Sequence, residues 1–180
     1  MIIMPCVILF TDIHDFSIVQ RHLGDRAGEF VQQVYERLGE EIVCSHGTII
    51  KYLGDAIMAV FPDKAEAAAV RCAFSMRRGY AELVREWKLP GETELEVGIG
   101  SGKVVRATFG HPSRRCEDVF GEEVNCTAVI SHHRGVAVTA AARERLKESF
   151  RTRRLPDQIV KWRPEPLEVW EVLPEHQGGA

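Results

Sequence analysis

Residues 47–61 read GTIIKYLGDAIMAVF, which is two apolar runs joined by a two-residue turn. The runs Thr48 to Leu53 and Ala56 to Phe61 have the length and the β-branched content of strands. Gly54-Asp55 between them is a typical Gly-led turn of a β-hairpin. The pattern therefore predicts a hairpin with Asp55 at its tip.

Helical and strand-like patterns alternate on both sides of this hairpin. The expected elements are a strand at Val7–Thr11, a helix at Gly28–Ser45, a helix from Pro62 to Trp87, strands at Leu95–Gly100 and Val104–Phe109 flanking Ser101-Gly102-Lys103, a polar loop at His111–Glu117, a helix beginning near Val124, a strand at Val136–Thr139, a helix at Ala140–Phe150, and a hairpin of Ile159–Trp162 with Leu167–Val172. The core order predicts an α/β (α+β) sandwich. Its ferredoxin-like βαββαβ core has a mostly antiparallel sheet with helices on one face, followed by a C-terminal strand pair.

Composition limits the class of protein. The 180 residues suit one domain, expected at 1–174, with 175–180 as a disordered tail. A formal net charge of −3 gives no reason to expect nucleic-acid binding. The 5 cysteines are scattered and form no C-x-x-C pair, which argues against disulfides or a zinc site. The chain has no apolar run of membrane-spanning length, so we expect no membrane insertion and a cytoplasmic location.

Two aspartates at strand ends are the candidates for metal chemistry. Asp12 directly follows the first strand and Asp55 lies at the hairpin tip, and in this fold order the two strands are neighbours. Carboxylates held close repel each other unless a cation lies between them. Hard oxygen ligands suit Mg²⁺ or Mn²⁺ bound together with phosphate oxygens. Considered alone, both residues are explained equally well as turn or cap residues.

Five motifs, in the right order, resemble those of the class III adenylate/guanylate cyclases. They are residues 10–17 (FTDIHDFS), 47–61, 97–102 (VGIGSG), 118–125 (DVFGEEVN) and 161–170 (KWRPEPLEVW). The first two are similar to the metal motifs of that family, and the last is similar to its C-terminal strand pair. Each motif alone is a weak signal, but together they extend the resemblance from about Val7 to Val172.

The resemblance implies conversion of ATP to 3′,5′-cyclic AMP and pyrophosphate by a two-metal mechanism. Asp12 and Asp55 match the metal-holding aspartates, and Ile13 is expected beside them at the two Mg²⁺ or Mn²⁺ ions. One ion would activate the ribose 3′-oxygen and the other would bind the triphosphate. The backbone that enters the following helix would bind phosphates through its N–H groups, at Ile13, His14, Asp15, Phe16 and Ser17.

Four further positions match substrate contacts of the family. Lys51 and Asp118 match the pair that reads the purine edge, where a Lys donor beside a carboxylate acceptor fits adenine; guanylate cyclases usually hold Glu and Cys there. Asn125 matches the asparagine that orients the ribose, and Lys161 matches a lysine that contacts the triphosphate. The structural alternatives are a surface strand lysine, a loop carboxylate, a helix N-cap and a solvated lysine, in that order.

The family also implies a two-fold, head-to-tail homodimer with its sites at the interface. One subunit would donate Asp12 and Asp55 to a site. Its partner would donate the remaining groups, which are Lys51, Asp118, Asn125 and Lys161. A monomer would then hold no complete site.

Two positions depart from the family. The transition-state arginine is expected four residues after Asn125, where this chain has Val129. Losing a charged donor costs about 10²–10³ in rate, and arginine-finger cases cost up to about 10⁵. The other departure is Asp15, where the family often has Gly; its charge is unfavourable near phosphates unless it faces away or helps to hold a metal. The side chains considered as substitutes for the arginine are His132, His133, Arg114 and Arg115, each of which is better explained as exposed polar surface.

The sequence thus favours a homodimeric adenylate cyclase that is slowed by Val129. Two alternatives stay open. One is a degenerate cyclase domain that binds nucleotide as a sensor or dimerisation module, and the other is a cyclase for a different nucleoside triphosphate.

Overall fold

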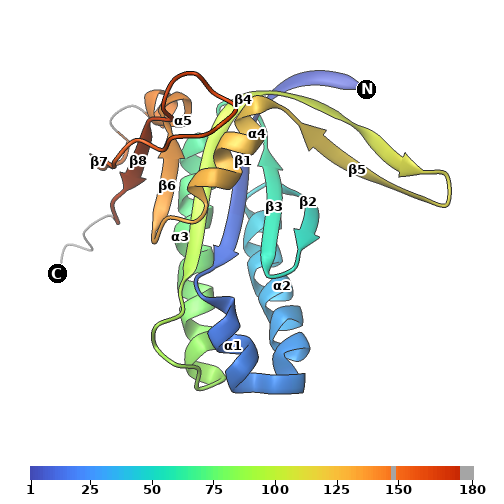
Figure 1. Cartoon of the computed structure of the whole chain (residues 1–180), viewed down its shortest axis with the longest axis vertical. Coiled ribbons are helices and arrows are strands. Elements are labelled where there is room, and N and C mark those ends of the chain that lie inside the picture. Colours follow the sequence, from blue (N-terminus) through green and yellow to red (C-terminus); the bar gives the residue numbers. More distant parts are fainter. Residues whose placement is uncertain (147–148, 175–180) are drawn as a thin grey trace.

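Eight strands form one sheet in the computed structural model, which describes residues 1–146 and 149–174 (Figure 1). The strands are β1 (Ile2–Ile13), β2 (Thr48–Leu53), β3 (Ala56–Phe61), β4 (Leu95–His111), β5 (Arg114–Phe120), β6 (Val136–Thr139), β7 (Thr152–Arg154) and β8 (Val169–Val172). The helices are α1 (Phe16–Leu23), a 3-10 turn η1 (Gly24–Arg26), α2 (Ala27–Cys44), α3 (Glu66–Glu86), α4 (Glu122–Ile130) and α5 (Ala140–Leu146). The mixed α/β class predicted from the sequence is confirmed.

The strand order is β2-β3-β1-β4-β6-β8-β7, with β5 paired to β4 outside this order. The pairs are antiparallel apart from β4 with β6, which is parallel. The predicted hairpin is confirmed at both of its strands, and its turn places Asp55 beside the end of β1. Local information was sufficient here because a Gly-led turn and two apolar runs specify a hairpin without distant contacts.

One long strand, β4, replaces the two strands predicted around Ser101-Gly102-Lys103. This segment continues the ladder with β1, where Ser101 pairs with Val7 and Gly102 with Cys6. The glycines of β4 make room for α4 instead of forming a turn. A Cβ at Gly100 would lie 2.1 Å from Thr127 Oγ1, and one at Gly98 would lie 2.6 Å from the Thr127 carbonyl oxygen.

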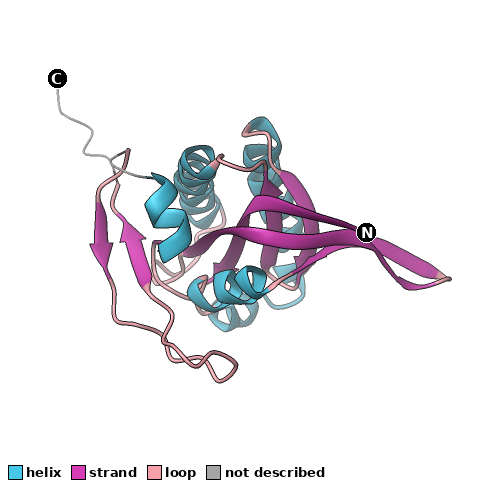
Figure 2. Cartoon of the chain, turned by 90° about the horizontal axis from the view of Figure 1, so that it is seen from above, coloured by secondary structure: helices cyan, strands magenta, loops and turns pink. Residues whose placement is uncertain are grey.

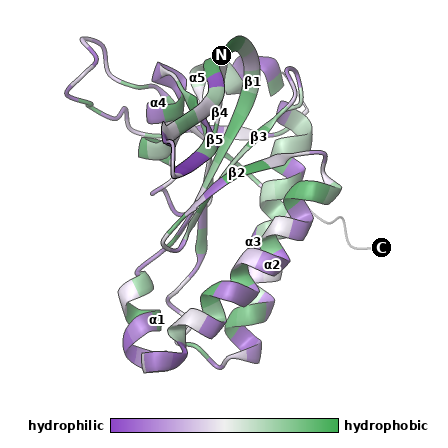
Figure 3. Cartoon of the chain, turned by 90° about the vertical axis from the view of Figure 1, so that its right-hand side faces the viewer, coloured by the Kyte–Doolittle hydropathy of each residue, from purple (hydrophilic) through white to green (hydrophobic). Residues whose placement is uncertain are grey.

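Helices cover both faces of the sheet (Figure 2), which corrects the expectation of one covered face. Val97 and Ile99 point into the large core with α2 and α3. The opposite face of β1 and β3 packs with Val124 of α4 in a smaller apolar cluster. Figure 3 shows that the hydrophobic residues of β1 and β3 run through the middle of the molecule, while α2 and α3 mix hydrophobic and hydrophilic residues. Among the described helices, none combines the length and apolarity needed to cross a membrane.

A two-stranded arm, formed by the end of β4 and by β5, projects from the sheet (Figure 1). The loop predicted at His111–Glu117 is therefore wrong, because most of that segment belongs to β5. Two contacts support the arm along its length. Arg106 pairs with Glu117, and the rings of Phe109 and Phe120 meet edge to face at 4.8 Å.

The C-terminal hairpin differs from the prediction. β8 pairs with β7 and with β6, whereas Ile159–Trp162 lies in a loop that is closed by a bridge between Gln158 and Leu167. The strand predicted at Val136–Thr139 is confirmed. The described part of the helix predicted at Ala140–Phe150 ends at Leu146, and residues 149–150 form a bend. The predicted tail at 175–180 lies outside the described residues.

Candidate active site

Asp12 and Asp55 meet at one end of the sheet. Asp12 is the penultimate residue of β1. The backbone N–H of Ile13, the last residue of that strand, donates to Asp55 Oδ2 at 3.3 Å. Burial raises the pKa of Asp55, and the neighbouring Asp12 carboxylate raises it further. Two partly buried carboxylates that repel each other form a site that a divalent cation would stabilise. The residues present therefore fit a metal.

Two more potential ligands flank Asp12. Glu96 lies directly across the β1–β4 ladder from Asp12, and His132 Nδ1 is 2.9 Å from Asp12 Oδ2. Asp12, Glu96 and His132 each offer one ligand atom, and these atoms all lie within 4.8 Å of one another. Sequence reasoning did not identify Glu96, because only the strand register reveals that it faces Asp12. His132 was considered as a substitute for the missing arginine. In the structure it contacts Asp12, one of the candidate metal ligands, within the same chain.

A chain of charged groups extends from this point. His14 Nδ1 is 2.8 Å from Glu96 Oε1, and the Glu96 side chain is only 3% exposed. Burial raises the pKa of Glu96, and the contact with His14 opposes that rise. Arg134 Nε lies 3.1 Å from His14 Nε2, and Asp15 Oδ2 is 3.3 Å from the same nitrogen. Arg134 Nε also lies 3.5 Å from Glu94 Oε1.

The expected phosphate-binding segment turns sharply into α1. Asp15 is the N-cap in the left-handed region, with φ 52°, and its side chain makes no capping hydrogen bond. The N–H of Ile13 donates to Asp55, and that of His14 donates to the Glu94 carbonyl at 2.9 Å. The first N–H groups of a helix have no partner within it. The backbone at Asp15, Phe16 and Ser17 therefore fits an anion better than that of Ile13 and His14.

Lys51 and Asp118 are paired even though 67 positions separate them. Lys51 Nζ is 2.7 Å from Asp118 Oδ2 and 2.8 Å from Oδ1. The side chains are 34% and 15% exposed, so both can reach a ligand. Asp118 belongs to β5, which excludes its alternative interpretation as a loop carboxylate. The structure therefore brings together the two residues predicted to read the base.

Asn125 and Lys161 lie on neighbouring segments. The N-cap of α4 is Gly121, so the N-cap alternative for Asn125 is wrong, and Asn125 is exposed in the first turn of α4. Lys161 is exposed in the loop between β7 and β8. Two residues later, Arg163 anchors that loop to α4, with its Nη1 3.3 Å from Cys126 Sγ. The predicted ribose and triphosphate contacts thus belong to two segments that pack together.

Comparison with known proteins places this arrangement in a family. The sequence model of the family described as "Adenylate and Guanylate cyclase catalytic domain" matches residues 3–172. The chain belongs to this family. This confirms the resemblance drawn from the five sequence motifs.

Relatives of this cyclase domain are longer proteins. It is 29% identical to "Adenylate cyclase" of Anabaena cylindrica, and the match covers 92% of this chain and 36% of the relative. It is 27% identical to "Adenylate cyclase 2" of Rhizobium meliloti (strain 1021), with coverage of 91% and 48%. The chain therefore spans less than half the length of these two curated relatives.

Solved structures of similar fold include cyclases of both base specificities. The adenylyl cyclase CyaB from P. aeruginosa matches with a TM-score of 0.89 and 20% identity over 100% of both chains. The guanylyl cyclase Cya2 matches with a TM-score of 0.84 and 21% identity over 98% of this chain and 96% of the other. At these identities the likeness establishes the shared fold, and the base has to be inferred from the residues of this chain.

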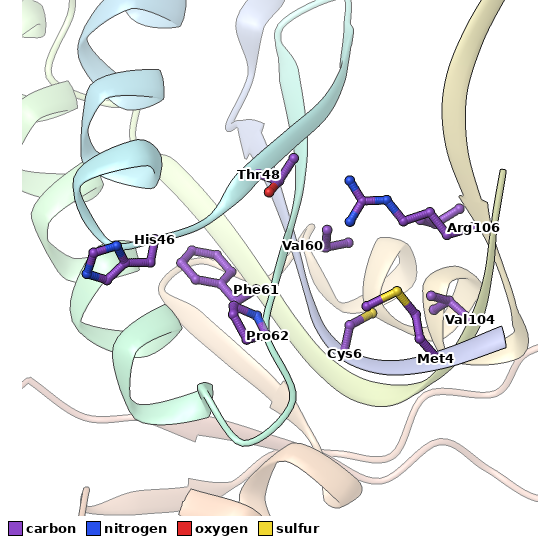
Figure 4. A pocket seen from close by; sticks show the side chains of 10 residues that line it. Met4, Cys6, His46, Thr48, Val60, Phe61, Pro62, Val104 and Arg106 are labelled. Atoms are coloured by element: carbon purple, nitrogen blue, oxygen red, sulfur yellow. The ribbon is translucent and has the colours of Figure 1, made fainter. Parts of the chain in front are cut away.

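The cavity shown in Figure 4 lies elsewhere in the cyclase domain. Cys6, Val60, Val104 and Val119 line it near the start of β1, with the Arg106 side chain beside it (Figure 4). Its volume is about 160 Å³, below the roughly 300–1,000 Å³ of typical ligand pockets. None of the predicted site residues lines it. This cavity is therefore too small for a nucleotide and lies away from the metal carboxylates.

Proposed function

We propose that this cyclase domain converts ATP to 3′,5′-cyclic AMP and pyrophosphate in a homodimer. The observation that carries the proposal is the Lys51–Asp118 pair, with Nζ 2.7 Å from Oδ2. A lysine donor and a carboxylate acceptor complement adenine, whose N1 accepts and whose N6 amino group donates. Guanine presents the opposite pattern at this edge. The names of the Anabaena and Rhizobium relatives support the same choice.

The metal half of the site consists of Asp12, Asp55 and the backbone at Ile13. Two Mg²⁺ or Mn²⁺ ions held there would supply charge neutralisation for the triphosphate and activation of the ribose 3′-oxygen. Burial raises the pKa of Asp55, so metal binding has to displace its proton at low pH. The nearby His132 adds an imidazole to the oxygen ligands, and imidazole is a better ligand for Mn²⁺ than for Mg²⁺.

The remaining groups bind and orient the substrate. The N–H groups at Asp15, Phe16 and Ser17 hold phosphate oxygens at the start of α1. Asn125 orients the ribose from α4, and Lys161 contacts the triphosphate. With the 3′-oxygen held in line with the α-phosphorus, the reaction is favoured mainly by positioning and by charge.

A two-fold dimer joins the halves. Within the described part of one chain, no hydrogen bond or ion pair links Asp12 or Asp55 to the Lys51–Asp118 pair. Large apolar side chains near the substrate-binding groups are exposed, which favours burial by a second subunit. They are Tyr52 (44% exposed), Leu53 (46%), Phe120 (51%), Trp162 (51%) and Ile159 (89%).

Cyclic nucleotide formation tests the proposed activity. Purified protein with ATP and Mn²⁺ should release cyclic AMP, and an Asp12→Ala, Asp55→Ala variant should release none. Both activities are measured by chromatography of the product. Equal product from the two proteins, or none from either, rules out this function.

Base specificity is tested separately at the paired residues. Lys51→Glu combined with Asp118→Cys replaces a donor–acceptor pair with the residues usual in guanylate cyclases, so preference should move toward GTP. The measurement is the ratio of kcat/KM for ATP and GTP. An unchanged ratio in a folded variant contradicts the assignment of the base-reading pair.

Val129 favours a second candidate, a nucleotide sensor without turnover. Without an arginine at this position, α4 itself offers no guanidinium to a transition state. Tight ATP binding combined with no product from either the wild-type chain or Val129→Arg would establish the sensor. Product from the wild-type chain excludes it.

A further inference from the structure

Arg163, in the loop between β7 and β8, extends its guanidinium along α4. Its Nη1 donates to Cys126 Sγ at 3.3 Å, and its Nε is 3.4 Å from Glu122 Oε1. A guanidinium has five N–H donors. Here one contact is with a thiol, a weak acceptor, and the other is with a carboxylate that is 66% exposed. Among the described residues, most of the binding capacity of this cation therefore stays unused.

The guanidinium contacts the same turn of α4 that an arginine at position 129 would be expected to cover. Side chains on a helix lean toward its N-terminus and cover the preceding turn. An arginine at 129 would thus cover the turn that contains Asn125 and Cys126. Glu122, Cys126 and Val129 share one face of α4, because they are separated by four and three positions. Arg163 contacts the first two of these residues from outside the helix.

We propose that Arg163 contacts the α-phosphate of the nucleotide and stabilises the charge that develops there, in place of an arginine at position 129. The inference rests on the proposed cyclase function. In the reaction the ribose 3′-oxygen forms a bond to the α-phosphorus while the bond to the pyrophosphate oxygen breaks, and the hydroxyl proton is released to solvent. Arg163 stays charged and exchanges no proton.

Neighbouring cations are engaged or placed elsewhere. His132 contacts Asp12, and Arg134 contacts His14 and Glu94. Arg114 and Arg115 lie at the far end of the arm formed by β4 and β5 (Figure 1). Arg163, by contrast, is two residues from Lys161, so one loop would supply two cations to the same triphosphate.

Glu122 does not prevent this role. Its carboxylate is exposed, and an ion pair exposed to solvent contributes little free energy. Replacing this carboxylate with a phosphate oxygen therefore costs little free energy. Before nucleotide binds, Glu122 and Cys126 hold the guanidinium against α4.

Substitution of Arg163 measures its contribution. Arg163→Gln should lower kcat for cyclic AMP formation about 10²–10³-fold, the typical loss for one charged or polar donor, with a smaller rise in KM. Arg163→Lys keeps the charge but lacks the forked donors, so its kcat should lie between those of the wild type and Arg163→Gln. Arg153→Gln is the matched control, because Arg153 is 65% exposed and pairs with Glu171 away from α4. An Arg163→Gln enzyme within twofold of wild type, or one changed in KM alone, overturns the proposal.

Rescue from the helix tests the shared position. Adding Val129→Arg to Arg163→Gln should raise kcat at least about tenfold above that of Arg163→Gln alone, because both arginines reach the same turn. Val129→Arg in the wild-type background should gain much less. Equal gains in the two backgrounds contradict a shared position.

A wild-type chain that makes no product refutes the cyclase function, and binding then decides the role of Arg163. The probe is 3′-deoxy-ATP with Mn²⁺, which lacks the attacking hydroxyl. Arg163→Gln should weaken its binding in calorimetry, and Arg153→Gln should not. Equal affinities of the Arg163→Gln and wild-type chains overturn the inference.

Discussion

Asp15 combines two unfavourable features at one residue. Its φ of 52° is in the left-handed region, which costs a side chain other than glycine roughly 1–2 kcal/mol and costs Asp somewhat less than most. Its carboxylate, which is 57% exposed and 3.3 Å from His14 Nε2, also adds negative charge to the segment proposed to bind phosphate. The positive φ explains physically why the family often has Gly here.

Two substitutions separate these features. Asp15→Gly should raise the free energy of unfolding by at most about 1 kcal/mol, because the gain in backbone conformation is offset by the entropy of glycine in the unfolded chain. Asp15→Asn tolerates the same φ and should leave stability nearly unchanged. Both remove the charge and should lower KM for ATP, measured by steady-state kinetics beside urea unfolding. A lower KM in the Gly variant alone would assign the effect to the backbone and contradict the electrostatic explanation.

At the same scale, the matched motifs predicted which residues lie together, whereas the roles of these residues stay predictions. The meeting of Asp12 with Asp55 and the partnership of Lys51 with Asp118 could be expected from matched motifs. Glu96 could not, because its place opposite Asp12 depends on the register between two distant strands. The contact of Arg163 with α4 could not be expected either, since nothing local indicates which helix its loop will contact.

Among the elements, the contact between β4 and α4 depends on glycine. Gly98→Ala would place a Cβ 2.6 Å from the Thr127 carbonyl oxygen, and backbone cannot yield as a flexible side chain does. Such overpacking typically costs about 1–3 kcal/mol. We expect Gly98→Ala to lose this amount in urea unfolding and to lower activity, since α4 carries Asn125.

Gly28→Ala is the control for this substitution. Gly28 lies in α2, where a Cβ meets nothing within 4 Å, so alanine should be neutral or should stabilise by up to about 1 kcal/mol. A Gly98→Ala protein as stable as Gly28→Ala would show that α4 can shift freely, contrary to the packing described.

The elements predicted correctly are those with local signals. The β2–β3 hairpin needs only its turn and its apolar runs, and the long helices need only their periodicity. The sequence-based prediction divided β4 into two strands at Ser101-Gly102-Lys103, because small residues there resemble a turn. In the structure the small residues allow α4 to pack close to the strand. β5 was missed because its exposed side chains lack alternation, and it is held by pairing with β4.

For the whole molecule, the proposed dimer makes a quantitative prediction about mixed subunits. An Asp12→Ala, Asp55→Ala chain lacks one half of the site, and an Asn125→Ala, Lys161→Ala chain lacks the other. Each alone should be inactive. Co-expressed in equal amounts, they should recover about a quarter of wild-type activity, because half of the dimers are mixed and each mixed dimer has one intact site.

The matched control uses two lesions in the same half. Asp12→Ala mixed with Asp55→Ala should recover nothing, because no pairing yields an intact site. Recovery in this control, or none in the complementary mixture, contradicts sites shared between subunits. Activity of the purified mixtures, with size-exclusion chromatography to confirm dimers, is the measurement.

The Lys51–Asp118 pair also bears on what happens before substrate arrives. In the proposed site the two groups already satisfy each other, so binding of a base would exchange their ion pair for contacts of each group with the base. A molecule that offers only a donor, or only an acceptor, gains one contact and leaves the other group without its counter-ion. We therefore expect inorganic polyphosphates and simple amines to compete poorly for this position, because neither offers both a donor and an acceptor. The ion pair would thus make the free protein selective without a conformational change.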